Sequence, residues 1–213
     1  MNNWYLEMDL MCTSATTISL MYVQFFIGML VSRFLTFIPD SVGRKRSVIG
    51  GMTLSLVAQI TMLLVPNMLI RSVGFFVLGL STIKNSQTYA WGSECVPLKR
   101  RTSAFTVINV VDAMPALVTG LVYLVLTRDW FMVYAMNVLV SLSALFLAFI
   151  CPESPRWLLY NNRQDDAIDT LNYMAKFNGK EDRRIAADAI FYETLEIADL
   201  NLSNDLRNND DAV

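Results

Sequence analysis

The chain has 213 residues, 54% of them hydrophobic, and a mean hydropathy of +0.40. This composition is more apolar than that of a soluble domain of the same length and indicates membrane-spanning segments. It contains no histidine, which excludes histidine-based catalysis and His-ligated metal sites, and its three cysteines lack the spacing of metal ligands. The net charge of −2 hides an asymmetry, because residues 1–162 carry 11 Lys and Arg against 7 Asp and Glu, whereas residues 163–213 carry 6 against 12.

Apolar segments follow one another along most of the chain and predict five membrane-spanning helices. A polar and aromatic outer segment, residues 1–14, comes first, and it lacks the basic region that begins a signal peptide. A helix needs about 20 largely apolar residues to cross a bilayer. The predicted spans are residues 15–38, 47–65, 68–89, 104–126 and 130–150. Residues 15–151 are therefore predicted to form one membrane block, and the fold class is predicted to be all-α, a multi-pass bundle of membrane helices.

The character of the chain changes after the fifth span. Apolar residues from Ala167 to Met174 recur at helical spacing among acidic residues, which is typical of an amphipathic helix. Gly179 ends this pattern, and a second one follows over residues 183–200. We therefore expect cytoplasmic amphipathic helices within residues 152–200 and a disordered acidic tail over residues 201–213.

Basic residues in the short connections predict the orientation of the membrane block. Lys and Arg are concentrated after the first, third and fifth spans, and short loops rich in these residues stay in the cytoplasm. The concentrated set is Arg44, Lys45, Arg46, Lys99, Arg100, Arg101, Arg156 and Arg163. The opposite connections hold only Arg71 and Arg128, both near span ends. The N-terminus is therefore expected on the outer side and the C-terminus in the cytoplasm.

Two motifs in the connections resemble those of a known family. Asp40-x-x-Gly43-Arg44-Lys45 resembles the loop between helices 2 and 3 of the major facilitator superfamily. Tyr89-x-x-x-x-Glu94-x-x-Pro97-x-Lys99-x-Arg101 is similar to the end of helix 4 in the sugar-porter and organic-ion branch of that superfamily. Both motifs fall on the predicted cytoplasmic side of the block.

Two further motifs extend the resemblance to both ends of the block. Pro152-Glu-Ser-Pro-Arg-Trp-Leu-Leu159 is similar to the segment after helix 6 in the same branch, and Glu7-Met-Asp9-Leu-Met-Cys12 resembles the outer segment before helix 2 in organic cation and anion transporters. The four motifs stand in register over residues 1–180. The resemblance implies that the five spans correspond to helices 2 to 6 of a twelve-helix fold, a partial major facilitator fold, and that the family's first helix and second half have no counterpart in the chain.

The resemblance also implies a cytoplasmic gating network. Its predicted members are Asp40, Gly43, Arg44, Lys45, Glu94, Arg101, Glu153 and Arg156. A carboxylate beside a guanidinium makes a charge-assisted bond that can form in one conformation and break in another. Glu94 is expected to pair with Arg101, and Glu153 with Arg156. The alternatives are that the basic run from Arg44 to Arg46 only sets the topology and that the other charges are simply solvated.

Polar side chains at membrane depth are the candidates for contact with a solute. Lys84 in the third span and Asp112 in the fourth are expensive to place in a bilayer, and such groups usually face a cavity or a partner. The other predicted solute contacts are Gln24, Gln87, Tyr89 and Asn109. The alternatives are an ion pair between Lys84 and Asp112 that pins two helices together, a snorkelling Lys84, and amides that only join helices.

The expected function is transmembrane transport of a small organic solute, an organic ion or a sugar-like molecule, by alternating access. This needs no covalent step and no cofactor, so the chain is not expected to be an enzyme. The expected partners are the lipid bilayer, the solute, and a complementary half-transporter chain or a second copy, because such carriers bind solute between two halves. Nucleic acid is not expected to bind, and the resemblance favours the plasma membrane over an organelle. The alternative is a truncated, non-transporting homologue that acts as a membrane subunit or regulator.

Overall fold

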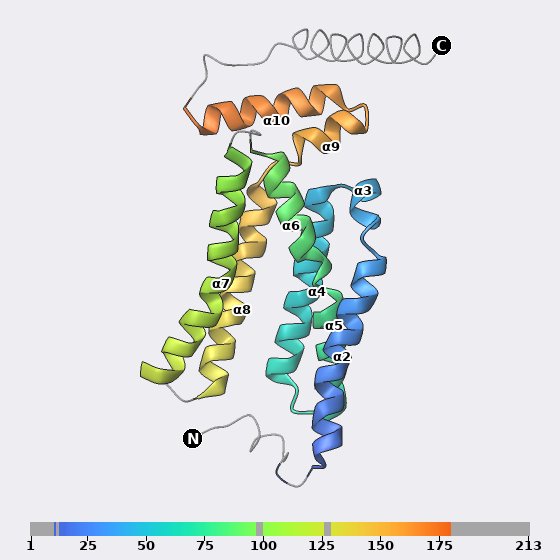
Figure 1. Cartoon of the computed structure of the whole chain (residues 1–213), viewed down its shortest axis with the longest axis vertical. Coiled ribbons are helices and arrows are strands. Elements are labelled where there is room, and N and C mark those ends of the chain that lie inside the picture. Colours follow the sequence, from blue (N-terminus) through green and yellow to red (C-terminus); the bar gives the residue numbers. More distant parts are fainter. Residues whose placement is uncertain (1–10, 12, 97–99, 126–128, 180–213) are drawn as a thin grey trace, which may run out of the picture. The chain divides into compact units, whose positions relative to one another are not determined.

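The computed structural model describes residue 11 and residues 13–96, 100–125 and 129–179, and every regular element within these ranges is a helix (Figure 1). The chain divides into two compact units, Met1–Glu153 and Ser154–Val213. The first unit contains α2 (Ala15–Phe34), α3 (Ile38–Val42), α4 (Arg44–Leu64), α5 (Met68–Leu80), α6 (Ile83–Glu94), α7 (Arg101–Val125) and α8 (Trp130–Ile150). The second contains α9 (Pro155–Tyr160) and α10 (Gln164–Phe177).

Four helices, α2, α4, α7 and α8, are long and apolar enough to cross a membrane by length and composition. The third predicted span differs, because it is formed by α5 and α6 with Ser81 and Thr82 between them. The two hydroxyl groups donate hydrogen bonds of 2.7 Å to the backbone carbonyls of Leu78 and Gly79, respectively. Such local side-chain bonds compete with the helical ladder. They explain why one apolar segment forms two shorter helices.

Two glycines allow α2 and α5 to pack closely. A Cβ atom built on Gly28 would lie 2.2 Å from the carbonyl oxygen of Phe76, and one built on Gly79 would lie 2.0 Å from that of Phe25. Each glycine therefore faces the backbone of the other helix. Small residues of this kind let membrane helices approach and are the main means of packing them in lipid. The α2–α5 contact is accordingly the most extensive in the first unit.

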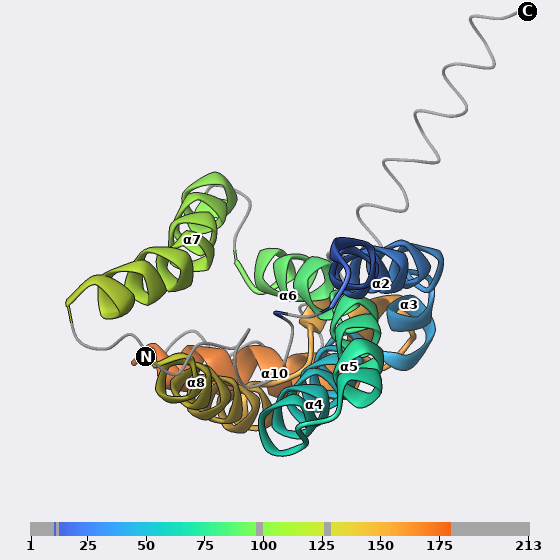
Figure 2. The same cartoon turned by 90° about the horizontal axis from the view of Figure 1, so that it is seen from below.

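Polar bonds also join helices of the first unit. Ser72 on α5 donates a hydrogen bond of 2.6 Å to Gln24 on α2, and Ser141 on α8 donates one of 3.1 Å to Gln59 on α4. By contrast, none of the side chains of α7 is buried. Figure 2 shows α7 standing apart from α2, α4 and α5. Helices α2, α4, α5, α6 and α8 thus form the packed part of this unit.

The second unit is built from two short helices. Ser154 caps α9 by accepting a hydrogen bond of 3.2 Å from the backbone N–H of Trp157, and Pro155 occupies the first turn, where its missing N–H costs nothing. α10 buries Ala167 and Ile168 on the apolar face of its amphipathic pattern. The outer segment before residue 11, the second amphipathic pattern at 183–200 and the acidic tail lie outside the described residues, as does Cys12.

Candidate functional site

The predicted gating motif contains a turn that favours glycine. Gly43 joins α3 to α4 with a φ of 113°, in a region that side-chain-bearing residues rarely adopt, and it is buried. The turn places Asp40 of α3 against Arg44, the first residue of α4, with 2.7 Å between Oδ1 and Nη1. The motif placed both residues in the predicted network, and the glycine turn brings them together although two helices are involved.

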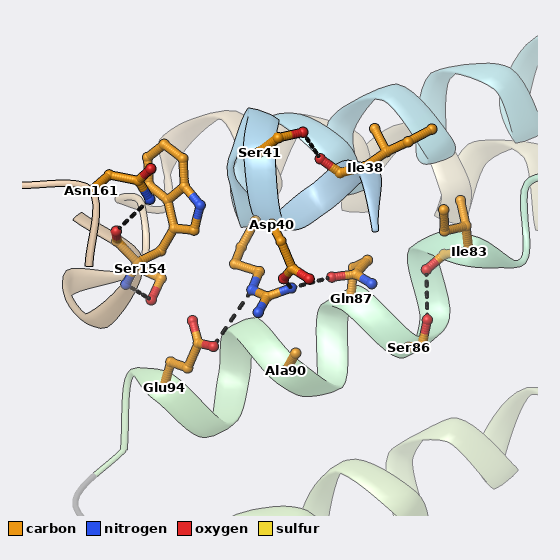
Figure 3. A network of polar contacts seen from close by, with 12 residues as sticks. Ile38, Asp40, Ser41, Ile83, Ser86, Gln87, Ala90, Glu94, Ser154 and Asn161 are labelled. Carbon is orange, nitrogen blue, oxygen red and sulfur yellow. Dashed lines mark hydrogen bonds and ion pairs between the residues drawn. The ribbon is translucent and has the colours of Figure 1, made fainter. Parts of the chain in front are cut away.

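Arg44 is the centre of a cluster that also includes α6. Its Nη1 donates a hydrogen bond of 3.0 Å to Gln87 Oε1, and its Nε lies 3.5 Å from Glu94 Oε1 (Figure 3). The latter distance is that of an ion pair without a hydrogen bond between these two atoms. The side chains of Arg44 and Glu94 are 18% and 14% exposed, whereas that of Asp40 is 64% exposed. The Arg44–Glu94 pair is therefore the better shielded of the two ion pairs.

A second contact holds the start of α4 to the end of α8. The backbone N–H of Lys45 donates a hydrogen bond of 2.8 Å to Glu153 Oε1, and Lys45 Nζ donates one of 2.9 Å to the carbonyl oxygen of Phe149. The first turn of a helix has N–H groups without helical partners and a positive partial charge. Glu153, three residues beyond the end of α8, thus acts as a cap on α4, a role that the sequence motif did not predict.

The structure gives Glu94 a different partner from the predicted one. Glu94 pairs with Arg44 of α4 rather than with Arg101. Arg101 is the first residue of α7, and its Nε is buried without a hydrogen bond to any described residue. Arg156 is an exposed residue of α9 in the second unit, so its predicted pairing with Glu153 stays a prediction.

The predicted solute contacts fall into four places. Gln87 is 5% exposed and belongs to the Arg44 cluster, and Gln24 joins α2 to α5. Lys84 lies against Gly51 of α4, where a built Cβ would stand 2.8 Å from the lysine Cβ. Tyr89 and Asp112 do come together, with 3.3 Å between the phenol oxygen and Oδ2. The considered ion pair between Lys84 and Asp112 is absent from the described residues, where Asp112 contacts Tyr89 instead.

A cavity that the sequence did not indicate lies among α4, α5, α7 and α8. It has a volume of about 320 Å³, and no charged side chain lines it among the described residues. Its walls are formed by Met62, Phe75, Leu78, Thr119, Tyr123, Trp130, Val133, Tyr134 and Asn137. Sequence reasoning missed it because these residues are ordinary constituents of apolar spans and carry no motif.

The chain is similar to known membrane transporters. The model of the family "Sugar (and other) transporter" matches residues 3–203. The organic cation/carnitine transporter 5 of Arabidopsis thaliana is 30% identical over 178 residues, 81% of this chain and 34% of that protein. The beta-alanine transporter of Drosophila melanogaster is 29% identical over 179 residues, 81% of this chain and 29% of that protein. The chain therefore spans about a third of the length of these curated relatives.

Solved structures show the same fold. The xylose transporter XylE from E. coli, in a partially occluded inward-open conformation, aligns with a TM-score of 0.65 over 89% of this chain and 51% of that chain, at 15% identity. A second structure of XylE, identified as a major facilitator superfamily protein, aligns with a TM-score of 0.57. The chain has part of the major facilitator fold and is an integral membrane protein. It belongs to the sugar (and other) transporter family.

Proposed function

We propose that the chain is part of a major facilitator-type carrier that moves a small organic solute across a membrane by alternating access. The observation that carries this proposal is the cluster around Arg44, which joins α3, α4 and α6 through one guanidinium. Family membership supports the same reading, and the named relatives are transporters and not enzymes.

The Arg44 cluster suits a latch that opens and closes. Its carboxylates come from α3 and α6, so a relative movement of these helices against α4 changes both ion-pair distances. The exposed Asp40 can exchange its bond for water at little cost, whereas the shielded Glu94 cannot. Movement that separates Glu94 from Arg44 therefore requires water or another partner to enter. In our proposal this end of the block faces the cytoplasm.

The solute is an organic ion or a sugar-like molecule, and Tyr89, Asn109 and Asp112 supply its polar contacts in our proposal. These side chains present a hydroxyl, an amide and a carboxylate at the boundary of α6 and α7. Lys84 lies elsewhere on α6, against α4, and serves the packing of these helices instead. Carriers of this kind bind solute between two halves, so a complementary chain or a second copy is a proposed partner.

Uptake into vesicles tests the proposal. The full chain is reconstituted alone and together with the remaining helices of a relative, and uptake of an organic cation, an organic anion and a sugar is measured. The expected result is saturable uptake of one class that is reduced at least about tenfold by Arg44→Gln and unchanged by Arg46→Gln, a matched control on an exposed residue. Equal uptake by both variants would argue against the latch. Absence of saturable uptake in every combination would favour a non-transporting membrane subunit.

A further inference from the structure

Aromatic rings from three helices form much of the wall of the cavity among α4, α5, α7 and α8. The rings are those of Phe75 on α5, Tyr123 on α7, and Trp130 and Tyr134 on α8. Trp130 and Tyr134 stand four residues apart and therefore share one face of α8, with 6.1 Å between their ring centroids and 60° between their planes. The cavity volume of about 320 Å³ falls within the range of small-molecule sites. The cavity therefore has the size and the walls to hold one small molecule.

A buried guanidinium behind one of these rings disfavours a cation in the cavity. Arg71 is 1% exposed, and its Cζ lies 5.6 Å from the centroid of the Trp130 ring. Its Nε donates a hydrogen bond of 3.0 Å to the carbonyl oxygen of Val65. The Trp130 ring is thus already engaged by one cation, and that charge would repel a second cation inside the cavity.

The cavity wall is also unsuited to an anion. No charged side chain among the described residues lines it, so an ion of either sign would lose its hydration without a counter-charge in the wall. Aromatic walls instead favour an aromatic molecule, because rings packed edge to face or offset add to the apolar contact. The composition of the wall therefore favours an uncharged aromatic occupant.

Two polar groups on α8 set the hydrogen bonds that an occupant can make. The Tyr134 O–H donates to the sulfur of Met62 at 3.9 Å, and a thioether is a weak acceptor. Asn137 lies three residues later on the same face of α8, and its Nδ2 donates a hydrogen bond of 3.1 Å to the carbonyl oxygen of Val133. The Oδ1 of Asn137 therefore stays available as an acceptor. A hydroxyl group in the cavity can accept from the Tyr134 O–H and donate to Asn137 Oδ1.

The cavity is separate from the proposed solute contacts on α7. Thr119 and Tyr123 of that helix line the cavity, whereas Asn109 and Asp112 meet Tyr89 of α6. The seven residues from Asp112 to Thr119 correspond to about 10 Å along a helix axis. None of the side chains of α7 is buried, so a molecule in the cavity would supply packing that this helix lacks.

We propose that this cavity is a binding site for a small uncharged aromatic molecule that carries a hydroxyl group, such as a phenol or an aromatic alcohol. The ring of the ligand packs against the aromatic walls, and its hydroxyl bonds to Tyr134 and Asn137. Binding requires only the cavity. An effect on transport rests on the proposed function, because an occupied cavity holds α7 in place and with it the proposed solute contacts Asn109 and Asp112.

Photolabelling of the full chain in lipid nanodiscs tests the binding. The probes share a phenyl diazirine and differ in one substituent, which is hydroxymethyl, methyl, trimethylammoniomethyl or carboxylate. Labelled peptides of α5, α7 and α8 are identified by mass spectrometry over a range of probe concentrations. We expect saturable labelling of the cavity by the hydroxymethyl probe and an affinity about fivefold lower for the methyl probe, which makes no hydrogen bond. The two charged probes should give no saturable labelling.

Two variants check where the probe binds and what it contacts. Thr119→Trp fills the cavity from α7 and should abolish saturable labelling, whereas Val118→Trp, on an exposed neighbouring residue, should not. Tyr134→Phe keeps the ring but removes the hydroxyl, so the affinity for the hydroxymethyl probe should fall about three- to tenfold and that for the methyl probe should not change.

Three results would overturn the proposal. Equal affinities of the unmodified chain for the hydroxymethyl and methyl probes would indicate an unselective apolar space that lipid chains can fill. Saturable labelling by the trimethylammonium probe would contradict the repulsion expected from Arg71. Saturable labelling retained in Thr119→Trp would place the bound probe outside the cavity. Because the readout is probe binding, failure of solute uptake affects the proposed function and leaves this site untouched.

Discussion

The Glu153 carboxylate accepts a hydrogen bond of 2.8 Å from the backbone N–H of Lys45, although 108 residues separate them in the chain. The Lys45 ammonium in turn donates to the carbonyl oxygen of Phe149 in the last turn of α8. A negative group thus meets the positive end of α4, and a positive group meets the negative end of α8. This exchange joins the second and fifth predicted spans at the same end as the Arg44 cluster.

Glu153→Ala should destabilise this junction by about 0.5–2 kcal/mol, the usual cost of losing a helix cap. Glu153→Gln should cost less, because the amide oxygen can still accept the Lys45 N–H bond. Thermal unfolding in detergent, followed by circular dichroism, measures both variants. Asp165→Ala on the exposed surface of α10 serves as control. A larger loss for the Gln variant than for the Ala variant would show that the cap is not the source of the effect.

Arg44→Gln should reduce stability by about 1–3 kcal/mol, because it leaves the shielded Glu94 without its cation. The double variant Arg44→Gln/Glu94→Gln should recover part of this loss, since the shielded residue 94 then carries no charge. A double-mutant cycle on thermal unfolding measures the coupling. Arg46 is exposed and lies two residues after Arg44 in the same helix, so Arg46→Gln should change stability by no more than about 0.5 kcal/mol. No recovery in the double variant would mean that Arg44 acts through Asp40 and Gln87 alone.

The sequence predicted the helices better than it predicted their partners. The helical class and the major facilitator fold followed from apolar length and from motifs, and both are confirmed. The break at Ser81 and Thr82 was missed because both residues fit within an apolar span, and their bonds to backbone carbonyls compete with the ladder only locally.

The contacts between residues of the candidate site were harder to predict than the helices themselves. The Asp40–Arg44 pair lies within one short motif, which is a local signal. The contacts of Arg44 with Gln87 and Glu94 depend on how α4 and α6 cross, and no spacing within the sequence encodes that crossing. For the same reason the sequence did not predict that Gln87 bonds to Arg44, and its contact with solute stays a prediction.

Alanine at Gly28 or Gly79 should separate α2 from α5. The added Cβ would stand 2.2 Å or 2.0 Å from a backbone oxygen of the facing helix, and a backbone cannot yield as a flexible side chain can. Each substitution should cost about 1–3 kcal/mol. Gly50→Ala and Gly120→Ala are matched controls within helices, because nothing lies within 4 Å of a Cβ built there. They should leave stability unchanged or raise it by up to about 1 kcal/mol. Similar losses at all four positions would indicate that helix packing is not the cause.

Cys95 follows the last residue of α6, and its thiol should react slowly with alkylating reagents. Burial, then the charges of Glu94, Cys151 and Glu153, raises the pKa of Cys95 from 9.0 to about 11. Only the thiolate is nucleophilic, so the alkylation rate should keep rising about tenfold per pH unit up to about pH 10. The neutral thiol also stabilises the folded state, fully below pH 9 and progressively less as the pH rises through about 11.

The measurement is maleimide labelling of the full chain with Cys12 and Cys151 replaced by serine, followed by mass spectrometry from pH 7 to pH 10. Replacing Cys151 removes one of the smaller causes of the shift, so burial and Glu94 should still delay the rise of the rate. Glu94→Gln lowers the pKa of Cys95 and should therefore speed labelling at pH 8, and Asp165→Asn, remote in sequence and exposed, should not. A rate that levels off near pH 9, as for a free thiol, would show that the carboxylates and burial do not act on Cys95 as the structure requires.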